Sequence, residues 1–327
     1  MNTHPYDRLG PDLVIAAVES AGYPCDARLL ALNSYENRVY QVGIEDGEPL
    51  IAKFYRPGRW DDAQILEEHS FSQELVEADI SVVAPIADAQ GQTLHRHEDF
   101  RFALFPRRGG YPPELDNPDN LLVLGRTLGR IHAVGAAQPF RQRHTLSAQT
   151  MLSDSRDYLL REGFIPLALE EAYATLSADL ERQVQTLFAE ADAQQFIRVH
   201  GDCHVGNILW RDDTAHFVDL DDCCMAPAVQ DLWMFLSGER HERQLQLSEV
   251  IEGYAEFMDF APRQLRWVEA LRTMRLVHYA AWLARRWEDP AFPRSFTWFN
   301  TERYWADHIL ELREQLAALQ EEPLALL

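Results

Sequence analysis

Hydrophobic and polar positions alternate in the first third of the chain, which predicts a small antiparallel sheet. The run NRVYQVGI alternates, EDGEP supplies a turn and LIAKFY alternates again, so we expect a hairpin over 37–55. Two shorter strand-like runs, ISVVAPIA and FRFALFP, lie further along. Between them and the hairpin, RWDDAQILEEHSFSQELVEAD carries apolar residues at nearly helical spacing. We expect one helix there of about five turns, which begins near Asp61 or Asp62.

The pattern becomes helical after the stretch RRGGYPPELDNPDN, which is rich in Gly, Pro, Asn and Asp. Such a composition is typical of a connection between lobes, so we divide the chain into 1–108 and 109–327. Helices are predicted at 119–136, 146–162, 166–191, 228–236, 241–258, 262–288 and 301–320. Strand patterns interrupt them at FIRVHGDC, NILW and AHFVDLDD. We therefore expect a mainly helical second lobe with an acid-rich loop and hairpin near its middle.

The charge of the chain excludes some classes of partner. Its 52 acidic and 30 basic residues give a net charge of −22, which would repel nucleic acid and an anionic membrane. No stretch approaches the roughly 18 apolar residues of a spanning helix, and the N-terminus lacks the pattern of a signal peptide. The 4 cysteines are too few and too bunched for a secreted disulfide framework. We expect a cytoplasmic protein with reduced thiols, and a monomer.

The segment VHGDCHVGNILW admits two interpretations, of which the first is a zinc site. The available thiols and imidazole come as the adjacent pairs Cys203–His204 and Cys223–Cys224. Neighbouring side chains in an extended chain point to opposite sides, so four ligands would converge poorly on one tetrahedral ion. A structural zinc site is therefore the weaker interpretation.

The second interpretation is a phosphoryl-transfer site. Asp202 is followed after four residues by Asn207, and after eleven more by Asp219 at the end of a predicted strand. Kinases use a first carboxylate to orient the attacking hydroxyl, and an amide oxygen and a second carboxylate to hold Mg²⁺. The string HGDCHVGN fits the kinase catalytic loop, with Gly201 in its middle position. We predict that Asp202 and Asp219 are catalytic and that Asn207 and Asp219 bind Mg²⁺.

A kinase site also needs a strand lysine for the ATP phosphates and a helix glutamate that holds this lysine. Lys53 lies in the middle of the apolar strand LIAKFY, where a lone charge needs a reason. The following helix offers Glu67 and Glu68. We favour Glu68 as the partner of Lys53 and keep Glu67 as the alternative.

With these residues in place, the chain resembles the phosphotransferase branch of the protein-kinase-like fold, which includes aminoglycoside and choline kinases. Within that branch it resembles more closely the bacterial stress response kinase A family of serine/threonine protein kinases. The strings that carry the resemblance are LNSYENRVYQ, KFYRPGRW, QILEEH, HGDCHVGNILWRD, FVDLDD, PAVQDLWM and AWLARRWEDPAFP. The resemblance implies an α+β bilobal fold, with a small antiparallel-sheet N-lobe containing one helix and a larger helical C-lobe.

The resemblance also implies roles for individual residues. Asp202 would be the catalytic base, Asn207 and Asp219 would bind Mg²⁺, and Ser34 would contact ATP. Asp231 would brace the catalytic loop through its backbone amides. Asp221 and Asp222 have no firm counterpart in the family, and either assistance to the metal or a place on the surface would suit them.

Two departures from ordinary protein kinases stand out. LNSYENRVY replaces a glycine-rich loop but contains no glycine, so backbone amides can approach phosphate less closely there. Side chains of Ser34 and Asn37 are candidates to substitute for them. DLD replaces D-F-G, and too few residues separate Asp219 from QDLWM for an activation loop.

The resemblance favours a kinase that uses ATP and Mg²⁺ to phosphorylate Ser and Thr hydroxyls of proteins, itself included. The alternative is a small-molecule kinase for an aminoglycoside, choline or another amino alcohol or sugar hydroxyl, since an acidic lobe suits a cationic acceptor. Arg285 and Arg286 in AWLARRWEDPAFP could line the acceptor cleft. We favour instead a helix terminus with favourable dipole placement and a packed aromatic cluster for this segment.

Overall fold

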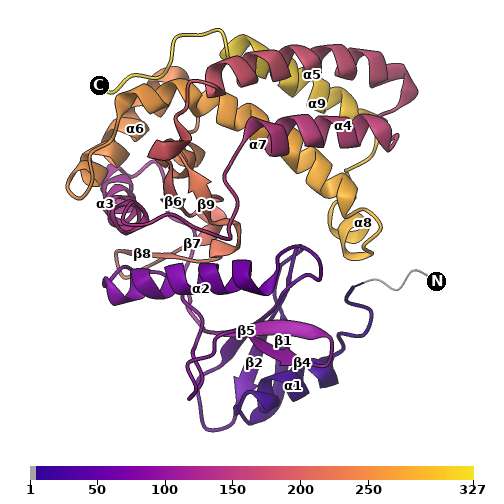
Figure 1. Ribbon diagram of the computed structural model, residues 1–327, viewed down its shortest axis with the longest axis vertical. Coiled ribbons are helices and arrows are strands. Elements are labelled where there is room, and N and C mark those ends of the chain that lie inside the picture. The colour runs from indigo at the N-terminus through magenta and orange to yellow at the C-terminus, as the bar shows by residue number, and fades with distance from the viewer. Residues whose placement is uncertain (1–4) are drawn as a thin grey trace.

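The computed structural model describes residues 5–327, which form two lobes (Figure 1). The lower lobe in Figure 1 contains a five-stranded antiparallel sheet with the order β1-β2-β3-β5-β4. Its strands are β1 (Cys25–Ala31), β2 (Arg38–Ile44), β3 (Leu50–Phe54), β4 (His95–His97) and β5 (Phe100–Pro106). The hairpin predicted over 37–55 is confirmed as β2 and β3, and Lys53 lies between Val39 and Ala103 in the centre of the sheet.

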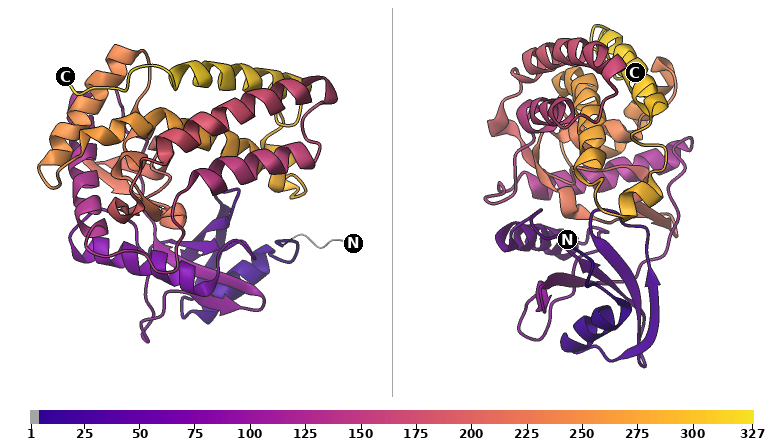
Figure 2. Two further views of the ribbon diagram at one scale, coloured as in Figure 1. Left: turned by 45° about the horizontal axis from the view of Figure 1, so that its top comes forward. Right: turned by 90° about the vertical axis from the view of Figure 1, so that its right-hand side faces the viewer.

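Helix α2 (Asp62–Glu77) begins where its sequence predicts. Asp61 caps it by accepting a hydrogen bond from the backbone of Gln64, whose side chain in turn accepts one from the backbone of Asp61. Figure 2 shows that α2 lies on the side of the N-lobe that faces the C-lobe. The helix can therefore offer side chains to both lobes.

The N-lobe contains elements that the sequence pattern did not predict, among them strands β1 and β4. A further helix, α1 (Pro11–Ser20), packs Val14, Ala17 and Val18 into the core of the sheet. The run ISVVAPIA forms no strand of the sheet. Its residues Ser81 and Val83 exchange hydrogen bonds of 2.9 Å with Phe217 of the C-lobe, and the amide of Ile86 donates one of 2.7 Å to Leu104 of β5. A short apolar run does not reveal which lobe its backbone will bind, so the sequence pattern alone could not place it.

The C-lobe is mainly helical, as predicted. Its larger helices are α3 (Pro118–Gly135), α4 (Asp154–Arg161), α5 (Leu167–Phe188), α6 (Arg240–Ala255), α7 (Val268–Arg285) and α9 (Glu302–Ala318). Shorter helical segments are η1 (Gln149–Ser153), η2 (Ala193–Gln195), η7 (Pro262–Trp267) and α8 (Ala291–Ser295). Helices α3 and α6 cross closely, because a Cβ on Gly125 or on Gly253 would lie 2.0 or 2.1 Å from a carbonyl oxygen of the other helix. The small residues thus fix the distance between these two helices.

The prediction of a helix over 228–236 is wrong in detail. The segment forms two 3-10 turns, η5 (Ala228–Asp231) and η6 (Trp233–Phe235), after Pro227. All four residues of η5 are buried, and Asp231 accepts hydrogen bonds from another loop. Tertiary contacts of these inward side chains outweigh the helical pattern.

Short strands of the C-lobe position the loop that carries the predicted catalytic residues. Strand β6 (Ile197–Val199) pairs with β9 (Cys224–Ala226), and β7 (Ile208–Arg211) pairs with β8 (Thr214–Phe217). The turns η3 (Val205–Asn207) and η4 (Leu220–Asp222) lie between them. In Figure 1 these elements lie between α2 and the C-lobe helices. No helix within residues 5–327 is long and apolar enough to cross a membrane.

Candidate active site

The loop after β6 is held by the buried carboxylate of Asp231. Asp231 accepts hydrogen bonds from the backbone amides of His200 (2.7 Å) and Gly201 (2.9 Å), and Nε2 of His132 lies 3.0 Å from it. Gly201 has a φ of 87°, and a Cβ there would lie 2.2 Å from the carbonyl oxygen of Asp222. The bracing role expected for Asp231 is confirmed, and only glycine fits the middle position of the loop.

Asp202 is the acid that this loop presents. Arg275 of α7 donates a hydrogen bond to its Oδ1, and Nε2 of His204 lies 3.5 Å from Oδ2. The amide of Gly206 donates to Nδ1 of His204, so the ring proton lies on Nε2, toward Asp202. Burial tends to raise the pKa of Asp202, but the hydrogen bond from His204 and the charge of Arg275 lower it below its usual range. The group is therefore an ionised carboxylate at neutral pH.

Asn207 lies next to Asp202 and is joined to the strand that leads to Asp219. Its Nδ2 donates to the carbonyl of Asp202 (2.9 Å), which leaves its amide oxygen on the opposite side. The amide of Val218 donates to the carbonyl of Asn207 (3.0 Å). Asp219 follows with a φ of 58°, a left-handed conformation that turns the chain into η4. The structure thus brings all three predicted C-lobe residues together.

Lys53 reaches this group from the N-lobe. Its Nζ lies 2.8 Å from Asp219, 3.3 Å from Asp221 and 3.8 Å from Glu68. The side chain is only 8% exposed, so its charge depends on these partners. Burial tends to lower the pKa of Lys53, but Asp219, Asp221 and Glu68 raise it well above its ordinary value. Lys53 is therefore an ammonium ion that joins the two lobes.

The two glutamates of α2 have different partners. Glu68 points to Lys53, and burial raises the pKa of its carboxyl to about 7, against the opposing charge of Lys53. Glu67 instead accepts hydrogen bonds from the backbone amides of three consecutive C-lobe residues, 141–143, at 2.6 to 2.8 Å. The structure selects Glu68 over Glu67 as the neighbour of Lys53.

Asp221 and Asp222, whose place the sequence left open, both form ion pairs. Asp221 is 3% exposed and accepts from Nδ2 of Asn37 (3.1 Å) as well as from Arg59. Asp222 lies 2.5 Å from Nη2 of Arg59. Burial tends to raise the pKa of Asp221, but the charges of Lys53, Arg59 and Arg143 lower it. Asp221 is thus an interior acid rather than a surface one.

Arg59 is a further member of the site that the sequence pattern did not single out. Arg59 follows β3 and reaches from the N-lobe to both acids of η4 with a side chain that is 15% exposed. The available signal was the string KFYRPGRW, in which two arginines flank a Pro-Gly pair just after the strand of Lys53. The sequence pattern does not show that one of these arginines, Arg59, meets acids 162 positions away.

The segments around Ser34 and Arg286 meet each other. The hydroxyl of Ser34 donates to the carbonyl of Asn37 (3.1 Å), which closes the loop 32–37 on itself. Arg286 forms an ion pair with Glu36 of that loop at 2.9 Å, whereas Arg285 donates to the carbonyl of Asp154 on the other side of α7. The two neighbouring arginines therefore serve different regions.

Oxygen donors at this site suit a hard cation. No three His, Cys, Asp or Glu side chains among residues 5–327 gather as a metal-binding group. Mg²⁺ needs few protein ligands, because it keeps several waters and takes the rest of its oxygens from phosphates. The amide oxygen of Asn207 and the carboxylate of Asp219 are of the right type and come from neighbouring positions. The donor set therefore fits Mg²⁺ bound together with a nucleotide.

Comparisons with known proteins agree with this geometry. A model of the phosphotransferase enzyme family matches residues 28–268. The chain is 45% identical to Stress response kinase A of Escherichia coli (strain K12) over 321 residues, which cover 98% of this chain and 97% of that protein. It is 42% identical to the Serine/threonine protein kinase RdoA of Salmonella typhimurium (strain LT2) over 325 residues, which cover 99% and 98% of the two chains.

Solved structures show the same fold at much lower identity. Amicoumacin kinase hAmiN in complex with AMP-PNP, Ca²⁺ and Ami has a TM-score of 0.73 at 17% identity, over 95% of this chain and 94% of that one. Spectinomycin phosphotransferase APH(9)-Ia in complex with ADP and spectinomycin has a TM-score of 0.60 at 16% identity, over 89% and 93%. The chain belongs to the phosphotransferase enzyme family and, within it, to the stress response kinase A family, and it is a kinase.

Proposed function

We propose that this kinase acts in a cytoplasmic stress response and uses ATP and Mg²⁺ to phosphorylate Ser and Thr hydroxyls of proteins, including its own. The use of ATP is supported by one observation above all. Lys53 of the N-lobe sheet lies next to three carboxylates, those of Asp219, Asp221 and Glu68. A buried ammonium ion among three carboxylates is suited to exchange one of them for the phosphates of a nucleotide.

Each residue then has a task in the transfer. Lys53 would hold the α- and β-phosphates, and Glu68 would keep the lysine in place. Asn207 and Asp219 would hold Mg²⁺, which when bound neutralises the charge that develops on the phosphates. Ser34 would contact ATP from the loop above. The Asp202 carboxylate, ionised because its pKa is low, would accept the hydrogen bond of the attacking hydroxyl and orient it in line.

The surroundings of Asp202 bear on the acceptor. The guanidinium of Arg275 and the Nε2–H of His204 both face this carboxylate. An aminoglycoside or choline would bring a positive charge next to Arg275, whereas the hydroxyl of a peptide Ser or Thr brings none. This arrangement, together with the 42% identity to a serine/threonine protein kinase, supports a protein acceptor over a cationic small molecule.

The test is a transfer assay with γ-labelled ATP and Mg²⁺. The purified protein is incubated alone, with dephosphorylated casein, with an aminoglycoside panel and with choline. We expect label on the protein itself and on casein, and a fall of about 10²- to 10⁴-fold for Asp202→Asn, because the orienting base is lost. Lys53→Met should also abolish transfer.

A matched control is Asp213→Asn, the same substitution in the exposed turn between β7 and β8, where φ is 55° and asparagine is well tolerated. This variant should keep full activity. Label that appears only on a small molecule would replace the protein acceptor by the small-molecule alternative. An unchanged rate in Lys53→Met would contradict the role given to the N-lobe.

A further inference from the structure

Loop 32–37 lies where a protein kinase has its glycine-rich loop, yet it contains no glycine. Side chains fix its shape instead. The amide group of Asn37 donates to Asp221 at 3.1 Å and accepts from the backbone amide of Arg56 at 3.1 Å. Asn37 is 4% exposed, so the end of the loop is buried against the residues that follow Asp219.

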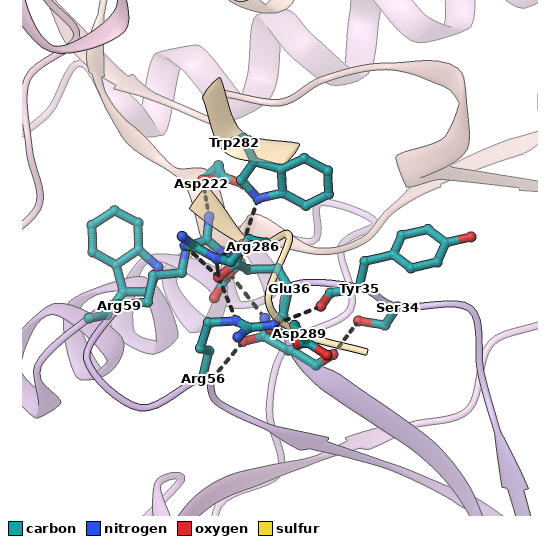
Figure 3. Close-up of polar contacts among 12 residues, drawn as sticks. Ser34, Tyr35, Glu36, Arg56, Arg59, Asp222, Trp282, Arg286 and Asp289 are labelled. Atoms are coloured by element: carbon teal, nitrogen blue, oxygen red, sulfur yellow. Dashed lines mark hydrogen bonds and ion pairs between the residues drawn. The ribbon is translucent and has the colours of Figure 1, made fainter. Parts of the chain in front are cut away.

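The tip of the loop is held from the other lobe. Glu36 accepts hydrogen bonds from the indole of Trp282 (2.6 Å) and from Nη2 of Arg286 (2.9 Å), both of which belong to the C-terminal part of α7 or follow it directly. Nε of Arg56, from the N-lobe, lies 3.0 Å from the same carboxylate. Figure 3 shows the Glu36 carboxylate between these groups, and its side chain is 12% exposed.

A second acid, Asp289 of the C-lobe, adds to the contact between the lobes. Asp289 accepts from Arg38 at 3.0 Å with both oxygens and from Nη2 of Arg56 at 2.7 Å. Arg56 also donates to the carbonyls of Tyr35 (3.1 Å) and Glu36 (2.8 Å), so it grips the loop backbone and both acids at once (Figure 3). Asp289 and Arg56 are only 3% and 6% exposed.

These pairs differ from ordinary surface ion pairs. The partners Glu36 and Arg286 are 250 positions apart and belong to different lobes. All the charged groups are largely buried, so the loss of one partner leaves an uncompensated charge in the interior. The end of α7 therefore holds loop 32–37 against the C-lobe, and the same helix carries Arg275, which donates to the carboxylate of Asp202.

We propose that Glu36, Trp282, Arg286, Arg56 and Asp289 form an interlobe clamp that positions loop 32–37 over the phosphates of ATP, in place of a glycine-rich loop. The proposal rests on the proposed function, because it takes this loop as the one that covers the nucleotide. Glu36 and Arg286 are positioning residues that act through the loop. Their loss should weaken ATP binding far more than it slows the chemical step.

The experiment compares Glu36→Gln, Arg286→Gln and the double variant with the wild type. Binding of a fluorescent ATP analogue with Mg²⁺ is measured first, and then KM for ATP and kcat. We expect each single variant to raise the Kd and the KM by about tenfold, with kcat within about threefold, because a buried partner is left unpaired. The double variant should be no worse than the poorer single one, and Arg286→Lys should recover part of the affinity because it keeps the charge.

Arg285→Gln is the matched control, since Arg285 is the next residue but contacts Asp154 and the ring of Tyr158 instead. It should leave the KM for ATP unchanged. Circular dichroism and thermal melting establish that every variant is folded, and Glu36→Asp provides a second test with the charge retained.

Nucleotide affinities within twofold of wild type in folded Glu36→Gln and Arg286→Gln would overturn the clamp alone. Loss of kcat without a change in KM would overturn it as well. A wild-type protein that binds no ATP analogue would remove both the clamp and the proposed function, which separates the two failures.

Discussion

The catalytic loop, 200–207, and loop 32–37 contribute to the same site but are held by different kinds of contact. The catalytic loop rests on backbone amides that donate to Asp231 within its own lobe. Loop 32–37 depends on ion pairs between charged side chains of the two lobes. The chief pairs are Glu36 with Arg286 and Arg56 with Asp289. Hydrogen bonds inside one lobe are lost only when it unfolds, whereas the interlobe pairs can separate while both lobes stay folded. The catalytic loop is thus fixed within its lobe, whereas loop 32–37, which we propose covers the nucleotide, is adjustable.

The largest effect should come from removing the support of the catalytic loop. Asp231→Ala leaves two buried amides and His132 without their acceptor, which should lower the free energy of unfolding by about 3 kcal/mol or more. Chemical denaturation measures this loss. Asp231→Asn keeps one acceptor oxygen, so its free energy of unfolding should lie between those of the wild type and Asp231→Ala. A stable and fully active Asp231→Ala protein would contradict the bracing role.

The next effect concerns the geometry of the same loop. A methyl group at Gly201 would meet the carbonyl of Asp222 at 2.2 Å and push the loop away from the segment that carries Asp219. Gly201→Ala should therefore lower kcat by about 100-fold, since small displacements of reacting groups are costly.

Gly163→Ala is its control, because Gly163 has a φ of 68° but no atom within 4 Å of the added methyl. It carries similar backbone strain without the clash, so its kcat should be that of the wild type. Equal activity in the two variants would show that the clash is relieved elsewhere.

Acid should weaken the N-lobe before it weakens the catalytic loop. Burial, and then the charge of Lys53, lowers the pKa of His69 to about 3, and the ring hydrogen-bonds Tyr55 and Thr93. The unfolded chain binds this proton near pH 6.5, so stability is lost progressively as the pH falls from about 6.5 to about 3. The loss from this one residue should reach about 2 kcal/mol at pH 5.

Denaturation at several pH values measures this slope, and His69→Gln should reduce it because the titrating group is gone. The pKa of Asp202 is lowered, so its carboxylate stays ionised across the same range. Because the raised pKa of Glu68 changes stability in the opposite sense over this range, the test is the difference between the two proteins, and equal pH slopes in the wild type and in His69→Gln would contradict the assignment to a buried neutral His69.

The smallest effect is that of salt. The clamp pairs are largely buried and therefore weakly screened, so 0.5 M KCl should raise the KM for ATP by the same factor, within about twofold, in the wild type and in Glu36→Gln. Arg285→Gln should keep the salt response of the wild type. A KM that rises many times more steeply with salt in the wild type than in Glu36→Gln would show that the interlobe pairs are open to solvent.

The sequence reveals those parts of the site whose residues are close neighbours along the chain. The spacing from Asp202 to Asn207 and the apolar strand around Lys53 required no knowledge of tertiary contacts. Glu67 and Glu68 are adjacent on a helix and differ by about 100° in direction. The packing of α2 against the C-lobe, which no local pattern reveals, decides which of them meets Lys53.

Long-range pairs are where sequence analysis fails. Arg59 is 162 positions from Asp221, and its role depends on the closure of one lobe on the other. The run ISVVAPIA has the composition of a strand, but its backbone hydrogen bonds are divided between Phe217 of the C-lobe and Leu104 of β5, so it joins no sheet as a strand. The division of the chain at 108/109 remains a prediction from composition.

The carboxylate of Glu67, bound to three consecutive amides of the C-lobe, bears on how such an enzyme is controlled. Glu74, further along α2, forms an ion pair with the buried Arg198, so the helix is attached to the C-lobe at two places. Many protein kinases are switched off when the corresponding helix swings outward. Here an outward swing would first have to break both attachments, so α2 keeps its inward position for as long as the two lobes stay in contact.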